Sequence, residues 1–186
     1  MKSLQKFTVF HRLLHWIIAS AMPILFITGF LRMYWMNKHN IVSVIESKTT
    51  AIPKEQMIEI AKSIREPMWQ WHVIFAHVVI FTFLARVIYM IVKGIRFPNP
   101  FNNKTPLKER LQGFIYLYFY TFVLISAVTG ISIRNGFFTD WKDGIETVHK
   151  WGIYWFPIFI LLHFTGILIA ECSNKKGITS KMIAGD

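Results

Sequence analysis

The chain contains little cysteine and few acidic residues. Its 186 residues include one cysteine, Cys172, so an internal disulfide and a cluster of thiolate ligands are both excluded. Aspartate and glutamate number 10 against 21 lysines and arginines, which gives a formal net charge of +11. This basic excess does not indicate a nucleic-acid-binding protein, because no basic helix face or basic patch interleaved with aromatic residues accompanies it.

Long apolar runs dominate the sequence instead. Hydrophobic residues make up 53% of the chain and aromatic residues 16%, and they occur in blocks. A membrane-spanning helix needs about 20 predominantly apolar residues, and in lipid every backbone polar group must be paired inside the protein. The sequence therefore predicts an all-α integral membrane protein, a four-helix bundle in a single domain 1–186, with spans at about 13–34, 71–92, 111–133 and 149–170.

The connections between these spans predict the orientation of the chain. The connection 93–110 carries five basic residues and one acid, and both ends of the chain are basic as well. Short segments rich in lysine and arginine stay on the cytoplasmic side of a membrane. Both termini are therefore expected in the cytoplasm, and the long polar connection 36–69 is expected outside it.

A short amphipathic helix is predicted within that outer connection. Residues 53–66 have helical periodicity, and Pro67 is expected to end the segment. We expect this helix to pack on the protein's own surface; lying on the membrane or docking a partner are the alternatives. The residues that share its apolar face are Met57, Ile60, Ala61 and Ile64.

Histidines inside the predicted spans are the candidate functional residues. His149 and His163 lie fourteen residues apart in the last span, so on one helix both rings point to the same side, about 21 Å apart along the axis. This distance fits within a hydrocarbon core about 30 Å thick. Pro157, between them, is expected to bend the helix. His15 begins the first span on the cytoplasmic side, and His72 begins the second on the outer side. Depth therefore pairs His15 with His163 and His72 with His149.

Two imidazoles at one level suit the iron of a haem. Two neutral imidazole ligands give a low-spin electron-transfer centre, and ionisable residues inside a membrane are usually functional. The pairing by depth thus predicts two haems in the core of the bundle. A single histidine is more simply explained by an interhelical hydrogen bond, but four that pair by depth favour ligands. His77 competes with His72; it lies deeper and about 140° round the helix, so both cannot face one iron.

Three further residues are candidates for contact with these haems. Arg86 lies fourteen residues after His72 and so shares its face at the inner level, where a guanidinium can pair with haem propionates. Snorkelling of Arg86 to the membrane interface is the alternative. Arg12 is a second candidate at the inner level. Gly29, in the first span, would let a flat cofactor approach the helix backbone.

Several of these motifs occur together. They are the Arg-Leu-Leu-His-Trp stretch at 12–16, Thr28-Gly29, His72 with Arg86, the His149 and His163 pair, and a third span without histidine. In this combination the sequence resembles the prokaryotic cytochrome b561 family, which includes the b-type cytochrome subunit of membrane-bound nickel-iron hydrogenases. The resemblance covers nearly the whole chain. It implies a location in the cytoplasmic (inner) membrane of a prokaryote and two b haems held by His15, His72, His149 and His163.

The resemblance also implies a function. The chain is expected to be a dihaem b-type cytochrome that carries electrons across the membrane between an outer-face redox partner and the quinone pool. A hydrogenase, a dehydrogenase or a cytochrome c would be that partner, so the chain is either an electron-transfer oxidoreductase or the membrane cytochrome subunit of one. The connection 36–69 is longer than in compact free-standing members, which favours a docking surface for another redox protein.

Two other functions remain as alternatives. A self-contained superoxide:quinone oxidoreductase is the first, although the acidic residues Asp140, Asp143 and Glu146 weaken the positive outer-face field that would steer superoxide. The second is a non-redox membrane transporter that uses the histidines. It predicts acidic partners inside the spans, and residues 13–34, 71–92 and 111–133 contain none.

Overall fold

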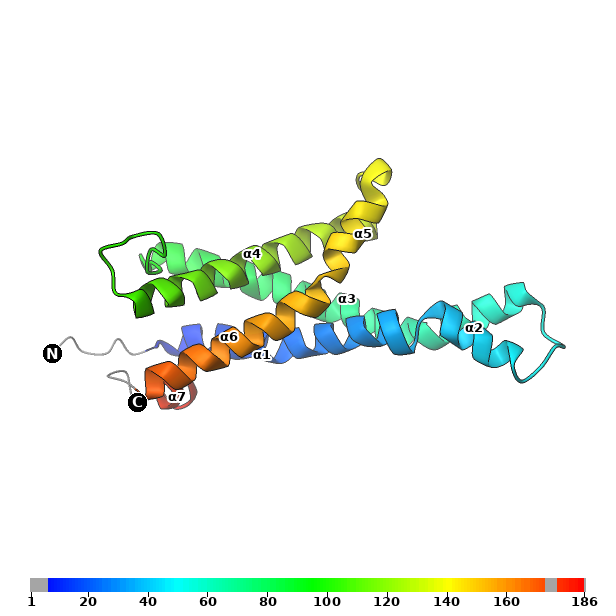
Figure 1. Ribbon diagram of the computed structural model, residues 1–186, viewed down its shortest axis with the longest axis horizontal. Helices are drawn as coiled ribbons and strands as arrows, with labels where there is room; N and C mark the ends of the chain where they lie inside the picture. Colours follow the sequence, from blue (N-terminus) through cyan, green and yellow to red (C-terminus); the bar gives the residue numbers. More distant parts are fainter. Residues whose placement is uncertain (1–6, 173–176, 186) are drawn as a thin grey trace. The chain divides into compact units, whose positions relative to one another are not determined.

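The computed structural model describes residues 7–172 and 177–185, and the regular elements in this part of the chain are all helical, as the sequence predicts. Lys2, Lys6, Lys175 and Lys176, which contribute to the predicted orientation, lie outside the described residues. The elements, labelled in Figure 1, are α1 (Val9–Phe30), a π-helical turn (Leu31–Trp35), α2 (Lys38–Glu46), α3 (Lys54–Val92), α4 (Leu107–Asn135), a 3-10 turn (Thr139–Trp141), α5 (Lys142–Lys150), α6 (Gly152–Glu171) and α7 (Ile178–Ile183).

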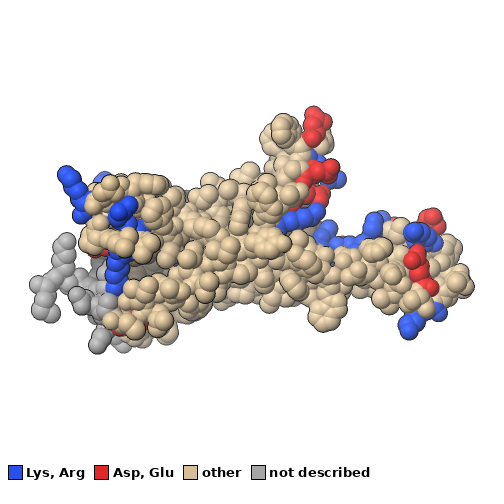
Figure 2. All heavy atoms as spheres, in the orientation of Figure 1, with Lys and Arg blue, Asp and Glu red and all other residues tan. Residues whose placement is uncertain are grey.

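In the described part of the chain, four helical segments are long and apolar enough to cross a membrane. Large apolar side chains on them are exposed; Phe81 is 67% exposed and Leu161 is 70% exposed. Such a surface is unfavourable in water and is solvated by lipid chains in a membrane. Figure 2 shows a broad uncharged surface over α4 and α6, with acidic and basic side chains gathered over α5. The four segments are Val9–Trp35, Lys54–Val92, Leu107–Asn135 and Thr139–Glu171.

The chain divides into two compact units: Ile17–Phe81, and Met1–Trp16 together with Thr82–Asp186. In the Ile17–Phe81 unit, α2 packs against the first turns of α3. Met57 is 4% exposed and Ala61 is 0% exposed, and both lie against the buried Val42 of α2. The expected packing of this segment on the protein's own surface is therefore confirmed for these two residues. The other two residues of the predicted face, Ile60 and Ile64, are exposed.

Helix α3 is longer than the sequence pattern predicts. The expectation that Pro67 ends the amphipathic segment is wrong, because α3 runs from Lys54 to Val92 with Pro67 inside it. Proline cannot donate a backbone hydrogen bond to the carbonyl of Ser63, which weakens one turn. The packing of the first turns on α2 stabilises the helix before this point, and the contacts of His72 stabilise it afterwards. One continuous helix therefore joins the connection 36–69 to the second span.

In the other unit, α4 packs against α6 through aromatic side chains. The ring centroids of Phe119 and Phe159 are 4.8 Å apart, and the Tyr118 hydroxyl donates a hydrogen bond of 3.0 Å to the Trp155 carbonyl. Aromatic pairs at this spacing stabilise helix contacts beyond the area that they bury. Phe159 also stacks on the ring of His163, with centroids 5.4 Å apart. This packing places a candidate ligand on a firmly held stretch of α6.

The last predicted span consists of two helices. α5 ends just before Trp151 and α6 begins just after it, and Figure 1 shows that the two helices meet at an angle. The expectation that one helix carries both His149 and His163 is therefore wrong. Gly152 is a poor helix former, and Pro157 lacks the N–H that would donate a backbone hydrogen bond in the first turns of α6. Both residues weaken the helix close to Trp151. Pro157 itself lies inside α6. The orientation of the two rings thus does not follow from their fourteen-residue spacing.

Candidate functional site

His15 of α1 and His163 of α6 lie side by side in the same unit. Their ring centroids are 6.2 Å apart and the ring planes differ by 40°. A metal–nitrogen bond is about 2 Å long and the nitrogen lies roughly 1 Å from the ring centre, so two imidazoles on opposite sides of one metal ion have centroids about 6 Å apart. Both residues are partly buried. The two imidazoles therefore lie at a separation at which both could bind one metal ion, and this pair would hold the haem iron that the sequence predicts.

Arg86 of α3 lies near this pair. It is close enough to interact electrostatically with both His15 and His163. Its Nε donates a hydrogen bond of 3.1 Å to the Tyr120 hydroxyl, and that hydroxyl donates to the sulfur of Met90 at 3.0 Å. The guanidinium is thus oriented by the chain itself. A cation held in this way beside two imidazoles can bind an anionic group of a ligand.

Arg12 has a different partner. Its Nη1 donates a hydrogen bond of 3.0 Å to the carbonyl of Ile183 in α7, and the Trp16 indole donates one of 3.2 Å to the carbonyl of Met182. These bonds fasten α7 beside the first turns of α1. The observed contact was not predicted from the sequence, and the contact of Arg12 with a haem stays a prediction.

His72 of α3 is held by α1 within the Ile17–Phe81 unit. Its Nδ1 lies 2.8 Å from the Thr28 hydroxyl. Trp69 stacks on the imidazole with centroids 5.6 Å apart, and the Arg32 guanidinium lies 4.1 Å from the centre of the Trp69 ring. A Cβ on Gly29 would be 3.8 Å from His72 Cε1, an ordinary van der Waals contact. Gly29 therefore lies beside a candidate ligand, but the space there would also accept a Cβ, and its contact with a haem stays a prediction.

His149 of α5 is held by α4 in a similar way. Its Nδ1 lies 3.0 Å from the Thr129 hydroxyl, and the backbone of Ser126 also forms a hydrogen bond with the ring. A Cβ on Gly130 would lie only 3.1 Å from His149 Cε1. Glu146, one turn earlier on α5, interacts with the imidazole electrostatically. The ring of His149 is thus held by contacts with the Thr-Gly pair of α4 and by an electrostatic interaction with Glu146 of its own helix, α5.

The other histidines have simpler surroundings. His77 is exposed, and its Nδ1 donates a hydrogen bond of 2.7 Å to the carbonyl of Val73 on its own helix. His39 is exposed on α2. His11 stacks on Phe7 with centroids 5.2 Å apart. Among the hydrogen bonds recorded for the described residues, none joins a ring nitrogen of these three histidines to a threonine hydroxyl.

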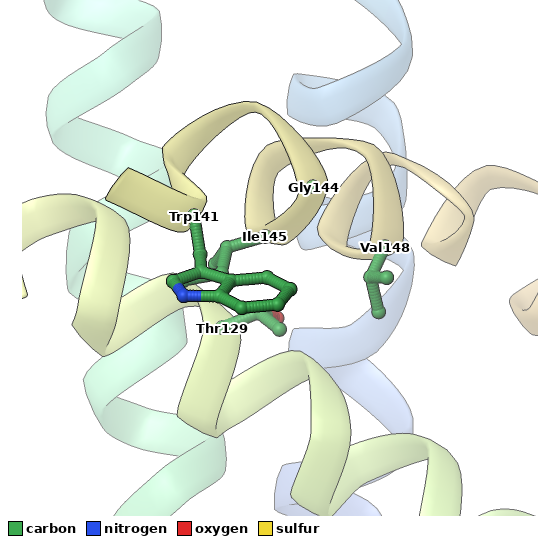
Figure 3. A pocket seen from close by; sticks show the side chains of 5 residues that line it. All are labelled: Thr129, Trp141, Gly144, Ile145 and Val148. Carbon is green, nitrogen blue, oxygen red and sulfur yellow. The ribbon is translucent and has the colours of Figure 1, made fainter. Parts of the chain in front are cut away.

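A small apolar cavity adjoins the His149 region. It has a volume of about 310 Å³ and is shown in Figure 3, where the Trp141 indole lies across it. The polar groups among the labelled side chains are the hydroxyl of Thr129 and the indole nitrogen of Trp141. Because Thr129 also contacts His149, a group bound in this cavity would lie beside that histidine. The lining residues are Thr129, Trp141, Gly144, Ile145 and Val148.

The sequence reasoning missed the threonine contacts. Thr28 enters the sequence pattern only as part of a motif, and Thr129 does not enter it. A signal existed, because the dipeptide Thr-Gly occurs at 28–29 and again at 129–130, each time inside an apolar helix. A threonine in an apolar helix has few polar groups within reach other than its own backbone. The repeated dipeptide was therefore a usable indication of two related contacts.

Comparison with known proteins gives one match. The family model described as prokaryotic cytochrome b561 matches residues 6–185, almost the whole chain. Neither a curated protein nor a solved structure matches. The matched region includes every histidine, arginine and threonine described above.

Proposed function

Since the chain belongs to the prokaryotic cytochrome b561 family, it is a membrane b-type cytochrome in electron transfer, and from this premise we propose its route and its ligands. The chain carries electrons across the cytoplasmic membrane of a prokaryote, between a redox partner on the outer face and the quinone pool. Both termini lie in the cytoplasm. Membership of this family favours electron transfer over a histidine-dependent transporter.

The pair of His15 and His163 carries this proposal. These residues hold the iron of an inner haem, and their centroid distance of 6.2 Å supports that role. Arg86 binds the propionates of the same haem, which is supported by its electrostatic interaction with both histidines. Phe159 keeps the His163 ring in place and covers one of its faces.

His72 and His149 hold the iron of a second, outer haem. These residues belong to different units, and their pairing comes from the equal depth that the sequence predicts. Each imidazole is fixed by a threonine and lies against a glycine of a neighbouring helix, which is support for a ligand role. When bound, the haems supply the one-electron redox chemistry, and the chain sets ligation, polarity and access of water.

The outer connection offers a surface for the redox partner. α2 and the first turns of α3 pack together through Val42, Met57 and Ala61, while Ile60 and Ile64 stay exposed beside that core. An ordered helical pair with exposed apolar side chains suits a hydrogenase, a dehydrogenase or a cytochrome c better than it suits superoxide, which needs a concentrated positive field.

The test is the haem content of purified protein and of single variants. We expect two b haems per chain in the reduced-minus-oxidised absorption spectrum and in the haem assay. His15→Ala and His163→Ala should each remove the same haem, and His72→Ala and His149→Ala the other. His77→Ala is the matched control and should retain both.

Three results would contradict the proposal. Folded protein without haem would return the histidines to a structural role. Loss of the outer haem in His77→Ala but not in His72→Ala would make His77 the ligand on α3. Haems that a soluble quinol analogue cannot reduce, and that a quinone cannot oxidise, would remove the quinone pool from the proposed route.

A further inference from the structure

The same local arrangement occurs in both units of the chain. In each, a Thr-Gly dipeptide on one helix faces a histidine on another. The Thr28 hydroxyl lies 2.8 Å from His72 Nδ1, and the Thr129 hydroxyl lies 3.0 Å from His149 Nδ1. His15 and His163 have no such threonine contact among the hydrogen bonds recorded for the described residues. The arrangement therefore marks two of the four histidines.

The hydrogen bonds of each threonine indicate which ring nitrogen carries the proton. The Thr28 hydroxyl donates to the carbonyl of Ile24 at 2.7 Å, and the Thr129 hydroxyl donates to that of Ile125 at 2.7 Å. A hydroxyl has one proton, and a carbonyl can only accept. With that proton directed to the helix backbone, the threonine oxygen must accept a hydrogen bond from the histidine. This hydrogen-bond arrangement favours Nδ1 as the protonated nitrogen in both rings.

This assignment has a consequence for metal binding. A neutral imidazole protonated at Nδ1 carries its lone pair on Nε2, the nitrogen that then binds a metal. A ligating histidine usually donates its second ring N–H to an oxygen acceptor, which fixes its tautomer and raises its basicity. The backbone bond of each hydroxyl fixes the threonine rotamer, so the acceptor is itself pre-organised.

We propose that Thr28 and Thr129 are positioning residues which hold His72 and His149 as Nδ1–H tautomers with Nε2 as the iron-binding nitrogen. The proposal rests on the proposed function, in which these two histidines hold the outer haem. Acceptance of the Nδ1–H bond increases electron donation to iron and so stabilises the oxidised state over the reduced state. The two threonines thus lower the midpoint potential of that haem and strengthen its binding.

The test replaces each hydroxyl by a methyl group of similar size. Thr28→Val and Thr129→Val should each lower the affinity for the outer haem by about 10–100-fold, the range found for the loss of such hydrogen bonds. In protein that retains the haem, the midpoint potential should rise, by about 59 mV for each tenfold change in the ratio of affinities for the two redox states. Thr28→Ser and Thr129→Ser retain the hydroxyl and should restore both properties.

Two controls separate this effect from a loss of structure. Thr147→Val removes a hydroxyl from the same helix as His149, but that hydroxyl donates to the Asp143 carbonyl at 2.8 Å, so the outer haem should be unchanged. The inner haem in every variant reports whether the protein is folded. The low-spin electron paramagnetic resonance signal of the outer haem should shift in the two valine variants only.

The outcomes distinguish the role of the threonines from the role of His72 and His149 as haem ligands. Valine variants with unchanged haem content, potential and spectrum would overturn the role of the threonines, even if His72→Ala and His149→Ala lose the haem. Equal losses in the valine and serine variants would overturn it as well, because the hydroxyl would then be irrelevant. Full haem content in both histidine variants would instead refute the proposed function. Raised potentials in the valine variants alone support the proposal.

Discussion

A methyl group added at Gly130 should disturb His149 directly. An alanine Cβ at this position would lie 3.1 Å from Cε1, 3.6 Å from Nδ1 and 3.9 Å from Nε2 of that ring. Carbon atoms in contact are ordinarily about 3.5–4.0 Å apart, so the imidazole must move by roughly 0.5 Å or leave its preferred rotamer. A displaced rotamer costs about 0.5–1.5 kcal/mol. At Gly29 the same substitution meets His72 at 3.8 Å and needs no movement.

The two alanine variants should therefore differ at the haem and agree elsewhere. Alanine favours a helix interior over glycine by about 1 kcal/mol. This gain offsets the strain in Gly130→Ala, so its thermal stability should stay close to that of the wild type, while Gly29→Ala should be slightly more stable. Displacement of the His149 ring should weaken its bond to the haem iron, so the affinity of Gly130→Ala for the outer haem should be lower by up to about tenfold.

The assay is a comparison of three quantities in detergent-solubilised protein. They are the number of haems that each chain retains when the protein is diluted, the midpoint potential of the outer haem, and the temperature of thermal unfolding measured by circular dichroism. Gly29→Ala serves as the matched control, because it has the same change of mass and helix propensity. An outer haem that behaves identically in the two variants would refute the claim that Gly130 leaves room for the His149 ring.

Two other substitutions test the inner site and the outer connection. Arg86→Gln removes a cation near His15 and His163 and should lower the inner-haem potential, because one charge about 10 Å away in a medium of effective dielectric about 20 contributes about 1–2 kcal/mol. Tyr120→Phe keeps the charge and should shift this potential less; equal shifts in redox titrations of both variants would contradict the electrostatic reasoning. Met57→Ala opens the α2–α3 core and should cost about 2–5 kcal/mol, seen as faster proteolysis of the outer connection. Ile60→Ala, at an exposed site, should have no such effect, and equal proteolysis rates would place the core elsewhere.

Much of the fold could be predicted from the sequence, because a membrane imposes strong constraints. Blocks of about 20 apolar residues leave the backbone no alternative to helices, so the class of the protein follows from composition and spacing. What could not be predicted depends on local packing. α3 continues through Pro67 because contacts on both sides stabilise it, and a proline signal alone does not include those contacts. The break at Trp151 likewise depends on a balance of weak terms around Gly152.

The candidate site shows the same division. Depth in the membrane follows from position along a helix, and the structure places His15 beside His163 with Arg86 near them, while their role as haem contacts stays a prediction. Depth alone does not predict which side chain forms a hydrogen bond with each histidine. The contacts of the Thr28 and Thr129 hydroxyls with histidine depend on which face of each helix packs against its neighbour. That face is determined by side chains from two segments that are separated in the sequence.

The surroundings of the histidines predict an order for the midpoint potentials of the two proposed haems. The inner pair lies near the cation of Arg86, which favours the reduced haem because reduction lowers the positive charge of the iron. At the outer level, hydroxyl acceptors increase ligand basicity, and the carboxylate of Glu146 acts on His149, so both contributions favour the oxidised haem. The inner haem should therefore have the higher midpoint potential, and electrons should pass downhill from the outer face inward. Redox titration of the wild type, with each haem assigned by His163→Ala and His149→Ala, measures this order directly. A higher potential at the outer haem would mean that solvent exposure or propionate charge outweighs the residues named here.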